Sequence, residues 1–399
     1  MKSWKDDPRA ATNPLFNGNR LKLGLFGLNA GHLIMSLAPD RYIADWNRCD
    51  AAVGMADALG LEVAVSLMGW EPRPELEPFT WATALAARHA HPAMVATMHV
   101  QLNHPVFVAK AAATGDRVSG GRFALNLVAG ANPATFGAFG VALEDHETRY
   151  AHAREWLDLL RRLWTAEEPF DFEGRFYKAD GVLSLPKPIQ HFPAIMNAGT
   201  SARGREFACE HADIVFTHIS ADLAEARTQI ADYKRYARET FDREVQIWTH
   251  GYTVIRETQR EAEDFLNYYA VEHADRARVE HFVTTLGATA QSMSAEERWK
   301  FDRNWAAGGG FGVVGSMERV AELLVALSDA GLDGILLNTI EPETMLDHLG
   351  RGVLPRLEAA GVRAPHCPGD RACSAQVLEE MDFTLQMNKR FENSRRRGQ

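Results

Sequence analysis

The feature that most constrains the fold is a regular alternation of short apolar runs with segments of helical periodicity. The first run spans residues 21–28 and ends at Asn29, and a segment with helically spaced apolar residues follows it. Because the runs are almost continuously apolar, both faces of each strand are expected to be covered, as in a parallel sheet. The unit recurs, and strands are predicted at residues 21–28, 61–67, 93–102, 122–128, 194–197, 213–217, 246–254 and 334–337.

Eight strands, each followed by a helix, predict an α/β fold of the (β/α)8 TIM-barrel type. The alternative is an open, doubly wound sheet, which commonly carries a glycine-rich dinucleotide loop after its first strand. Residues 27–33 read GLNAGHL and lack that G-x-G-x-x-G pattern. The barrel is the preferred interpretation, and it predicts that functional residues lie at the carboxyl ends of the strands.

The rest of the chain is interpreted as additions to this single barrel. Residues 1–20 are polar and rich in Pro, Gly and Asn, and they are expected to form a flexible N-terminal arm. The barrel is expected over residues 21–364, with insertions at about 166–190, which contains a short hairpin, and 274–312, which is charged and helical. Residues 365–399 are expected to form a helical C-terminal tail.

Composition argues against several classes of protein. The formal net charge is −10, so the average field of the protein repels nucleic-acid phosphates. The chain has no apolar run long enough to span a membrane and no secretory signal within residues 1–20. Its four cysteines form no Cys-x-x-Cys pair, which favours a reducing compartment. We therefore expect a cytoplasmic protein with neither a nucleic-acid nor a membrane partner.

Polar residues follow most of the predicted strands. The clearest signal is Gly199-Thr200-Ser201, because glycine lets the backbone approach a ligand and a helix N-terminus favours an anion such as phosphate. The alternative is ordinary helix capping by Ser201. His104 precedes Pro105 at the head of a helix, where it either caps the helix and packs on the rim or donates a hydrogen bond into the barrel mouth.

Two further side chains near the strand ends admit both a structural and a functional role. Asn126 lies within an apolar strand, so a buried position requires hydrogen-bond partners from the core or from a ligand. Trp70 is either surface cover or an apolar wall for a substrate. No grouping of His, Cys or carboxylate residues has the spacing of a metal site, and none is expected.

Several segments together resemble the bacterial luciferase-like flavin-dependent monooxygenases, nearest to the dimethyl sulfone and pyrimidine monooxygenase branch. The resemblance covers the chain from about residue 21 to residue 360. It rests on SGGRFALNLVAG at 119–130, HETRY at 146–150, FEGRFY at 172–177, LPKP at 185–188 and AGTSARGREFACEHAD at 198–213.

The resemblance implies an enzyme that uses reduced FMN and O2 to oxygenate or oxidatively cleave a small organic substrate, such as a sulfone, amide or heterocycle. It also implies a separate NAD(P)H:flavin reductase that supplies the reduced FMN, and a homodimer or homotetramer. By position, it assigns Met68 and Gly69 to the flavin ring, Asn126 to a flavin contact, and Arg149, Tyr150, Gly199, Thr200 and Ser201 to the phosphate.

Two positions depart from the family pattern. Relatives have Trp where this chain has Ala131 and Glu where it has Thr135, in a loop that lies over the flavin, so the pocket is expected to differ. The candidate catalytic residues are His104, Asn126 and Trp70, with His104 moving a proton or hydrogen-bonding the reacting oxygen. Two alternatives stay open: a deazaflavin-dependent oxidoreductase on the same fold, and a flavin-binding protein without turnover.

Overall fold

Eight parallel strands close into a barrel in the computed structural model, which describes residues 7–31, 33–70, 74–130, 132–285 and 293–366. The strands are hydrogen-bonded in the order β9-β11-β1-β2-β3-β4-β7-β8, and β8 pairs with β9 to complete the circle. The predicted TIM barrel is confirmed. Its strands are β1 (Lys22–Phe26), β2 (Val63–Val65), β3 (Ala93–His99), β4 (Phe123–Val128), β7 (Ala194–Asn197), β8 (Ile214–Phe216), β9 (Gln246–Arg256) and β11 (Gly334–Asn338).

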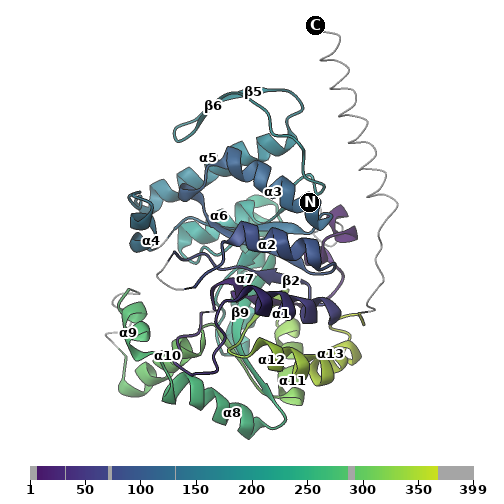
Figure 1. Cartoon of the computed structure of the whole chain (residues 1–399), viewed down its shortest axis with the longest axis vertical. Coiled ribbons are helices and arrows are strands. Elements are labelled where there is room, and N and C mark those ends of the chain that lie inside the picture. The colour runs from purple at the N-terminus through teal and green to yellow at the C-terminus, as the bar shows by residue number, and fades with distance from the viewer. Residues whose placement is uncertain (1–6, 32, 71–73, 131, 286–292, 367–399) are drawn as a thin grey trace. The chain divides into compact units, whose positions relative to one another are not determined.

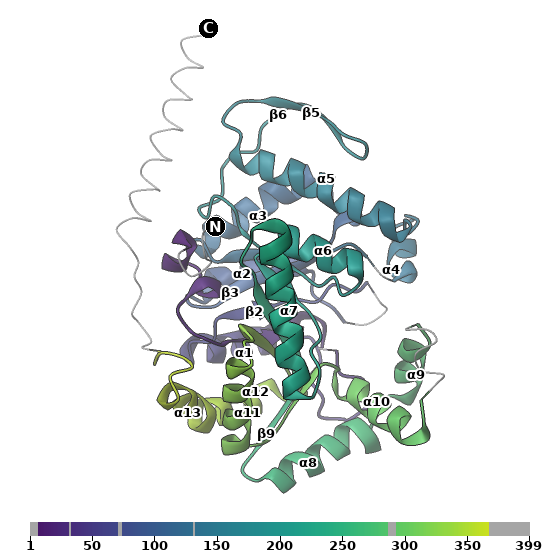
Figure 2. The same ribbon diagram turned by 180° about the vertical axis from the view of Figure 1, so that it is seen from behind.

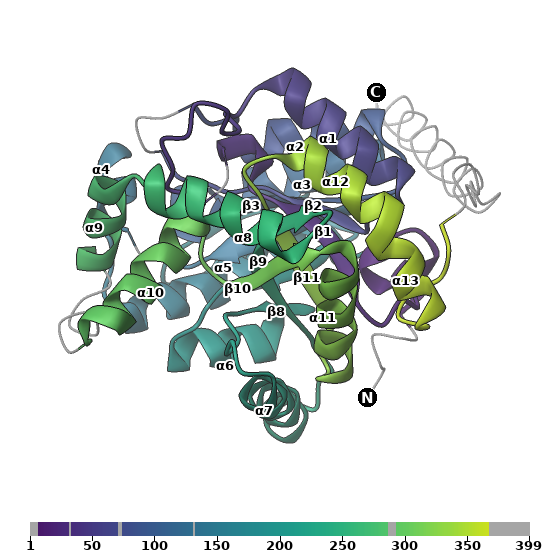
Figure 3. The same ribbon diagram turned by 90° about the horizontal axis from the view of Figure 1, so that it is seen from below.

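Helices surround the barrel (Figure 1; Figure 3). Several begin at a carboxylate that accepts hydrogen bonds from first-turn N–H groups, as Asp45, Asp145 and Asp222 do. Most of their apolar faces pack against the outward residues of the strands in one core, whereas α8 packs in a separate cluster that includes Tyr252 and Val254 of β9. The helices are α1 (Trp46–Ala58), α2 (Pro78–Arg88), α3 (Pro105–Ser119), α4 (Pro133–Ala138), α5 (His146–Thr165), α6 (Ala202–His211), α7 (Leu223–Phe241), α8 (Gln259–Asn267), α11 (Met317–Asp329), α12 (Pro342–His348) and α13 (Leu354–Ala359).

The barrel interior is a second apolar core, built from alternate residues of the strands. Val65 of β2, Trp248 of β9 and Leu336 of β11 belong to it and are fully buried. Because side chains alternate between the two faces of a strand, this set defines which residues point inward. The same phase reaches Asn126 on β4 and His250 on β9 near the carboxyl ends, so these polar side chains point into the mouth of the barrel.

β10 (Phe311–Ser316) is a ninth parallel strand that the sequence analysis did not predict. It pairs with residues 251–256 of β9, whereas β11 pairs with residues 248–252. The long strand β9 therefore belongs to the barrel at its start and carries β10 at its end. This strand was missed because two glycines interrupt the apolar run in the segment FGVVGS. In the structure, alternate residues of the strand are only half-buried.

The described part of the N-terminal segment, residues 7–20, packs under the barrel and so differs from the expected flexible arm. The short turn η3 (Pro14–Phe16) places Leu15 and Phe16 in the interior core, and Phe16 is only 1% exposed. At the start of β9, Nε2 of Gln246 donates to the Leu15 carbonyl at 2.8 Å. We call residues 13–16 the plug, because their apolar pair completes the interior at the amino-terminal end of the barrel.

Two insertions extend the barrel. β5 (Phe170–Glu173) and β6 (Lys178–Val182) form the expected hairpin, which lies along α5 (Figure 2). The second insertion is helical, as expected, with α9 (Arg276–Thr285) and α10 (Ala295–Ala307). The tail expected at residues 365–399 lies outside the described residues from position 367 onward. Among the described residues, no helix has the length and apolarity required to cross a bilayer.

Candidate active site

A cradle for an anion forms at the turn between β7 and α6. Oγ of Ser201 accepts from the backbone N of Gly204 at 3.1 Å and so caps α6, and it lies 2.9 Å from Nε2 of His146 at the start of α5. Gly199 and Gly204 are in close backbone contact, because a Cβ on Gly199 would lie 2.6 Å from Cα of Gly204. Thr200 and Ser201 are exposed, so their hydroxyls are accessible beside a helix N-terminus that favours phosphate.

Tyr150 of α5 borders this cradle, and Arg149 precedes it on the same helix. Tyr150 is 7% exposed, and its hydroxyl would lie 2.6 Å from a Cβ placed on Gly204. Nη1 of Arg149 donates to the carbonyl of Gly130, whereas its buried Nε has no hydrogen-bond partner. A half-buried guanidinium with an unused donor is suited to an anionic ligand, because charge-assisted hydrogen bonds to guanidinium are among the strong ones.

The loop after β2 is held from two sides. The backbone N of Gly69 donates to Oε1 of Glu75 at 2.7 Å, and its carbonyl accepts from Oγ1 of Thr135 at 3.2 Å. Trp70 has a positive φ of 68°, is 46% exposed, and meets the ring of Phe139 edge-on at 5.0 Å. Thr135, one of the two positions expected to depart from the family pattern, thus helps to fix the loop that the resemblance assigns to the flavin ring. Ala131, the other departure, lies outside the described residues.

Asn126 points inward near the end of β4 and is 4% exposed. Its Nδ2 donates to Oγ1 of Thr97 on β3 at 3.1 Å, while its buried Oδ1 has no hydrogen-bond partner. One strong acceptor is therefore unused at the mouth, where a ligand N–H could satisfy it. Met68, which follows β2, is half-buried and packs against the outer core.

His104 does not lie with these residues. It caps α3, where its Nδ1 accepts from the backbone N of Val106 at 3.3 Å, and its exposed ring stands edge-on to Tyr177 at 5.3 Å. Tyr177 belongs to the hairpin insertion outside the barrel and bonds to Nε2 of His152 at 2.7 Å. The placement favours the capping alternative, because the ring packs on the hairpin and not into the mouth.

Three histidines that the sequence analysis did not select hold positions at the mouth. His99 ends β3, His218 follows β8, and His250 lies within β9. Burial lowers the pKa of His99 to about 4 and that of His250 to about 3, and it also lowers the pKa of His218. All three are neutral at pH 7. Strand periodicity could have identified His250. It lies two residues after Trp248 on β9, so both side chains point to the inner face of the barrel.

These residues fit FMN. The unused Nε of Arg149 and the capped helix start at Ser201 suit a phosphate dianion, and the free Oδ1 of Asn126 suits an N–H of the flavin ring. Within the part of the chain that the structure describes, no group of three or more His, Cys, Asp or Glu side chains could hold a metal ion.

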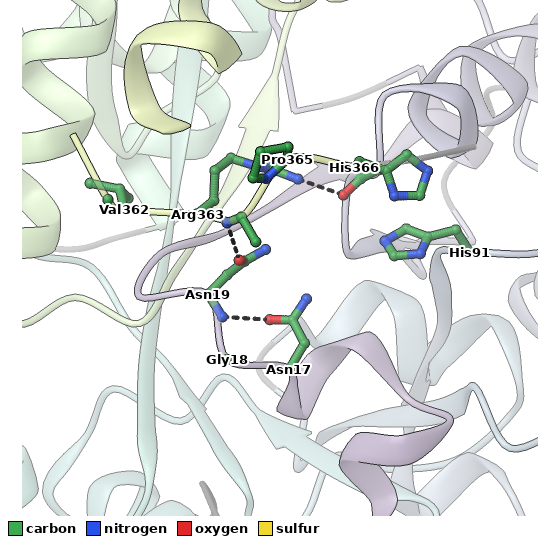
Figure 4. Close-up of a pocket in the computed structure, with 11 residues that line it drawn as sticks. Asn17, Gly18, Asn19, His91, Val362, Arg363, Pro365 and His366 are labelled. Carbon is green, nitrogen blue, oxygen red and sulfur yellow. Dashed lines mark hydrogen bonds between the residues drawn. The ribbon is translucent and has the colours of Figure 1, made fainter. Parts of the chain in front are cut away.

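A separate cavity of about 450 Å³ lies at the other end of the barrel, among the loops that precede β1, β2 and β3 (Figure 4). The backbone N of Ala364 donates to Oδ1 of Asn19 at 2.8 Å, and Nη2 of Arg363 donates to the Gly60 carbonyl at 2.7 Å. These bonds tie the last described residues to the amino-terminal end of the barrel. The cavity is remote from the strand ends that carry the candidate site.

Comparison with known proteins agrees with this geometry. The sequence profile described as luciferase-like monooxygenase matches residues 26–334, which is more than half of the chain. The chain belongs to the luciferase-like monooxygenase family. The resemblance seen in the sequence segments is confirmed, and this luciferase-like protein is a monooxygenase by family.

Individual relatives cover most of its length. The FMNH2-dependent dimethylsulfone monooxygenase of Pseudomonas putida is 29% identical over 339 residues, which cover 82% of this chain and 92% of the relative. A pyrimidine monooxygenase of Allorhizobium ampelinum is 28% identical over 331 residues, which cover 77% and 88%. The crystal structure of DmoA from Hyphomicrobium sulfonivorans matches with a TM-score of 0.77 at 18% identity over 88% of this chain and 91% of that chain, which confirms the luciferase-like fold.

Proposed function

We propose that this luciferase-like protein is the oxygenase component of a two-component system that uses reduced FMN and O2 to oxygenate or oxidatively cleave a small organic substrate. The observation that carries the proposal is the convergence of Ser201, Tyr150 and Gly204 at one helix N-terminus, with an unused Arg149 donor on the adjoining helix. The dimethylsulfone relative, named as FMNH2-dependent, supports the choice of cofactor. Its partner is an NAD(P)H:flavin reductase in the cytoplasm, and it acts as a homodimer or homotetramer.

Each element of the site has a distinct task in this reaction. Reduced FMN, when bound, supplies the electrons that activate O2. Arg149, Ser201 and the α6 N-terminus would hold the phosphate, and the unused Oδ1 of Asn126 would accept a hydrogen bond from the ring. Trp70 and Phe139 form an apolar pair of rings beside the β2 loop, and with a flavin bound this pair would limit the access of water to the reacting oxygen.

His99 is a better candidate than His104 for a hydrogen bond to the reacting oxygen. It ends β3, which lies between the strands that precede Met68 and carry Asn126. Its Nδ1 is buried without a hydrogen-bond partner, and burial lowers its pKa to about 4, so at pH 7 it is a neutral imidazole with an unused hydrogen-bonding atom for the reacting oxygen. Its ring is positioned edge-on against Phe136 of α4 at 5.7 Å.

The phosphate assignment can be tested with Arg149→Gln and two ligands that differ by one phosphate, FMN and riboflavin. We expect about 10- to 100-fold weaker FMN binding, because a charge-assisted hydrogen bond contributes roughly 1.5–3 kcal/mol. Riboflavin binding should stay unchanged. The matched control is Arg203→Gln, since Arg203 is ion-paired with Glu147 and Glu206 at 2.9 Å in each case. Equal loss of both ligands, or no loss of FMN, contradicts the assignment.

Turnover can be tested with a generic flavin reductase, NADH, O2 and candidate sulfones, amides and heterocycles. We expect substrate to be consumed in proportion to added protein when FMN is present and not when a deazaflavin replaces it. Tight FMN binding with no product from any substrate class would instead favour a flavin-binding protein without turnover.

A further inference from the structure

The barrel mouth divides into two arcs. The residues assigned to FMN lie on or after β2, β4 and β7, on one side of the strand order. The remaining arc runs through β8, β9 and β11 to β1. A substrate must meet the reactive edge of the flavin from space that the flavin does not fill, and this arc provides the other wall of the mouth.

An imidazole pair lies at the centre of this second arc. The rings of His218, after β8, and His250, on β9, have their centroids 5.1 Å apart. The buried ring of His250 lies 5.4 Å from that of Phe26, at the end of β1, while His218 is exposed and its ring lies 6.1 Å from that of Trp305 on α10. The arrangement gives an accessible imidazole backed by a buried one and bordered by an aromatic ring.

Two buried polar atoms beside this pair have no hydrogen-bond partner. They are Nε2 of His250 and Oδ1 of Asn338, on residues that are 5% and 0% exposed. The turn at residues 308–310 approaches both side chains: a Cβ on Gly310 would lie 2.8 Å from Nε2 of His250, and Nδ2 of Asn338 donates to the Gly308 carbonyl at 3.2 Å. The wall therefore carries hydrogen-bonding groups in excess of those that the protein itself satisfies.

The two imidazoles of the arc are uncharged at pH 7. Partial desolvation lowers the pKa of His218, although its side chain is reached by solvent, and burial together with His218 lowers that of His250 to about 3. Among the residues that the structure describes, no carboxylate, lysine or arginine contributes to either shift. Arg256, at the far end of β9, is already paired with Glu341 at 2.8 Å. Arg303 of α10 acts on Tyr252, further along β9, but on neither imidazole, so an anion placed at the pair would lose its hydration without gaining a counter-charge from a described side chain.

We propose that the β8–β9–β11 arc forms the wall of the substrate site and selects an uncharged, hydrogen-bonding molecule. In this proposal His218 makes the direct hydrogen bond, and His250, packed against it, holds the His218 ring in position. Small organic anions, such as sulfonates and carboxylates, are excluded. This inference rests on the proposed function, because it takes the opposite arc as the flavin side. Sulfones, amides and neutral heterocycles meet the requirement, since each has strong acceptors and no net charge.

Binding of size-matched probe pairs to the FMN-loaded protein tests the proposal. The pairs are dimethyl sulfone with methanesulfonate, acetamide with acetate, and uracil with orotate. The readouts are the shift in melting temperature and the protection of His218 from diethyl pyrocarbonate, followed by peptide mass spectrometry. We expect at least one neutral member to stabilise the protein and protect His218, with its anionic partner at least 10-fold weaker.

Variants at position 218 separate hydrogen bonding from packing. His218→Phe should weaken the neutral probe about 5-fold, because one hydrogen bond contributes roughly 1 kcal/mol, while His218→Asn keeps part of the affinity. His218→Arg should shift preference toward the anionic member of the pair. The control is His191→Asn, at an exposed residue before β7, at the opposite end of the barrel.

The affinity for FMN distinguishes the two levels of failure. His218 lies outside the cradle, so all four variants should bind FMN within about twofold of the parent protein. If the parent protein does not bind FMN, the proposed function is wrong. If the parent protein binds FMN normally, three results would overturn this inference and leave the proposed function intact. They are an anion that binds as tightly as its neutral partner, no binding of any neutral probe, and an unchanged affinity of His218→Phe for the neutral probe.

Discussion

At the scale of single residues, Asn126 and His104 show what a sequence can and cannot reveal. Asn126 was identifiable because an amide inside an apolar strand needs partners, and the structure leaves its Oδ1 unused. His104 and His99 are only five residues apart, yet one caps a helix beside Tyr177 and the other ends β3. Which imidazole reaches the mouth depends on where β3 stops, and sequence patterns define strand ends less well than strand centres.

His250 should make the stability of the protein depend on pH. Its pKa in the folded state, about 3, lies below the ordinary value of 6.5, so the unfolded state takes up the proton first as pH falls. The stability contribution is complete above pH 6.5 and is lost as pH falls towards 3. Relative to His250→Gln, the parent protein should lose about 2 kcal/mol more unfolding free energy between pH 7 and pH 5.

Urea denaturation at the two pH values measures this difference, and His191→Asn, at an exposed site, serves as the reference substitution. Identical pH dependence in the parent and His250→Gln proteins would show that His250 is not held neutral in the folded state.

At the scale of elements, the β7–α6 turn explains why the phosphate-binding motif could be recognised in the sequence. Its two glycines are required by contact, since any Cβ on Gly199 or Gly204 meets backbone or the Tyr150 hydroxyl within 3 Å. Such steric needs leave a visible pattern in a sequence. β10 left none, because its pairing with β9 depends on a strand far away in the chain and its own residues alternate without strong polarity.

Gly204→Ala should damage both the turn and flavin binding. The new methyl group would lie 2.6 Å from Tyr150 Oη and 2.7 Å from the backbone of Gly199, so the turn must shift. We expect a loss of about 1–3 kcal/mol in unfolding free energy and weaker FMN binding. Gly137→Ala in α4 is the control, because no atom lies within 4 Å of its added Cβ. Calorimetry and FMN titration should separate the two variants, and equal behaviour would contradict the close-contact argument.

At the scale of the whole molecule, barrel closure was predictable because the βα alternation is local and repeats eight times. The plug was not, because residues 1–20 are polar on average and only Leu15 and Phe16 carry its apolar character. The amino-terminal end of the barrel provides the missing partner, through the interior core and the Gln246 bond to Leu15. A two-residue apolar motif acquires meaning only when the cavity that it fills is known.

Phe16→Ala should therefore destabilise the protein as a core substitution does. We expect a loss of about 3–5 kcal/mol, because a fully buried phenyl ring is removed from a closed interior. Phe107→Ala, which deletes a ring that is 67% exposed, should change stability by less than about 0.5 kcal/mol. Thermal and urea unfolding of both variants test this. A change of less than about 1 kcal/mol in the free energy of unfolding of Phe16→Ala would show that residues 13–16 do not contribute to the core.

The pairing of β9 with both β10 and β11 determines which segments of the chain meet beside His250. The residues that hold β11 and the residues that hold β10 overlap at positions 251 and 252, one step beyond His250. Five residues, including the glycine turn at 308–310, separate Trp305 from β10. The ring that borders His218 and the strand that pairs with β9 next to His250 therefore belong to one continuous stretch of chain, and a substrate seated against His218 would contact the segment that completes the sheet beside His250.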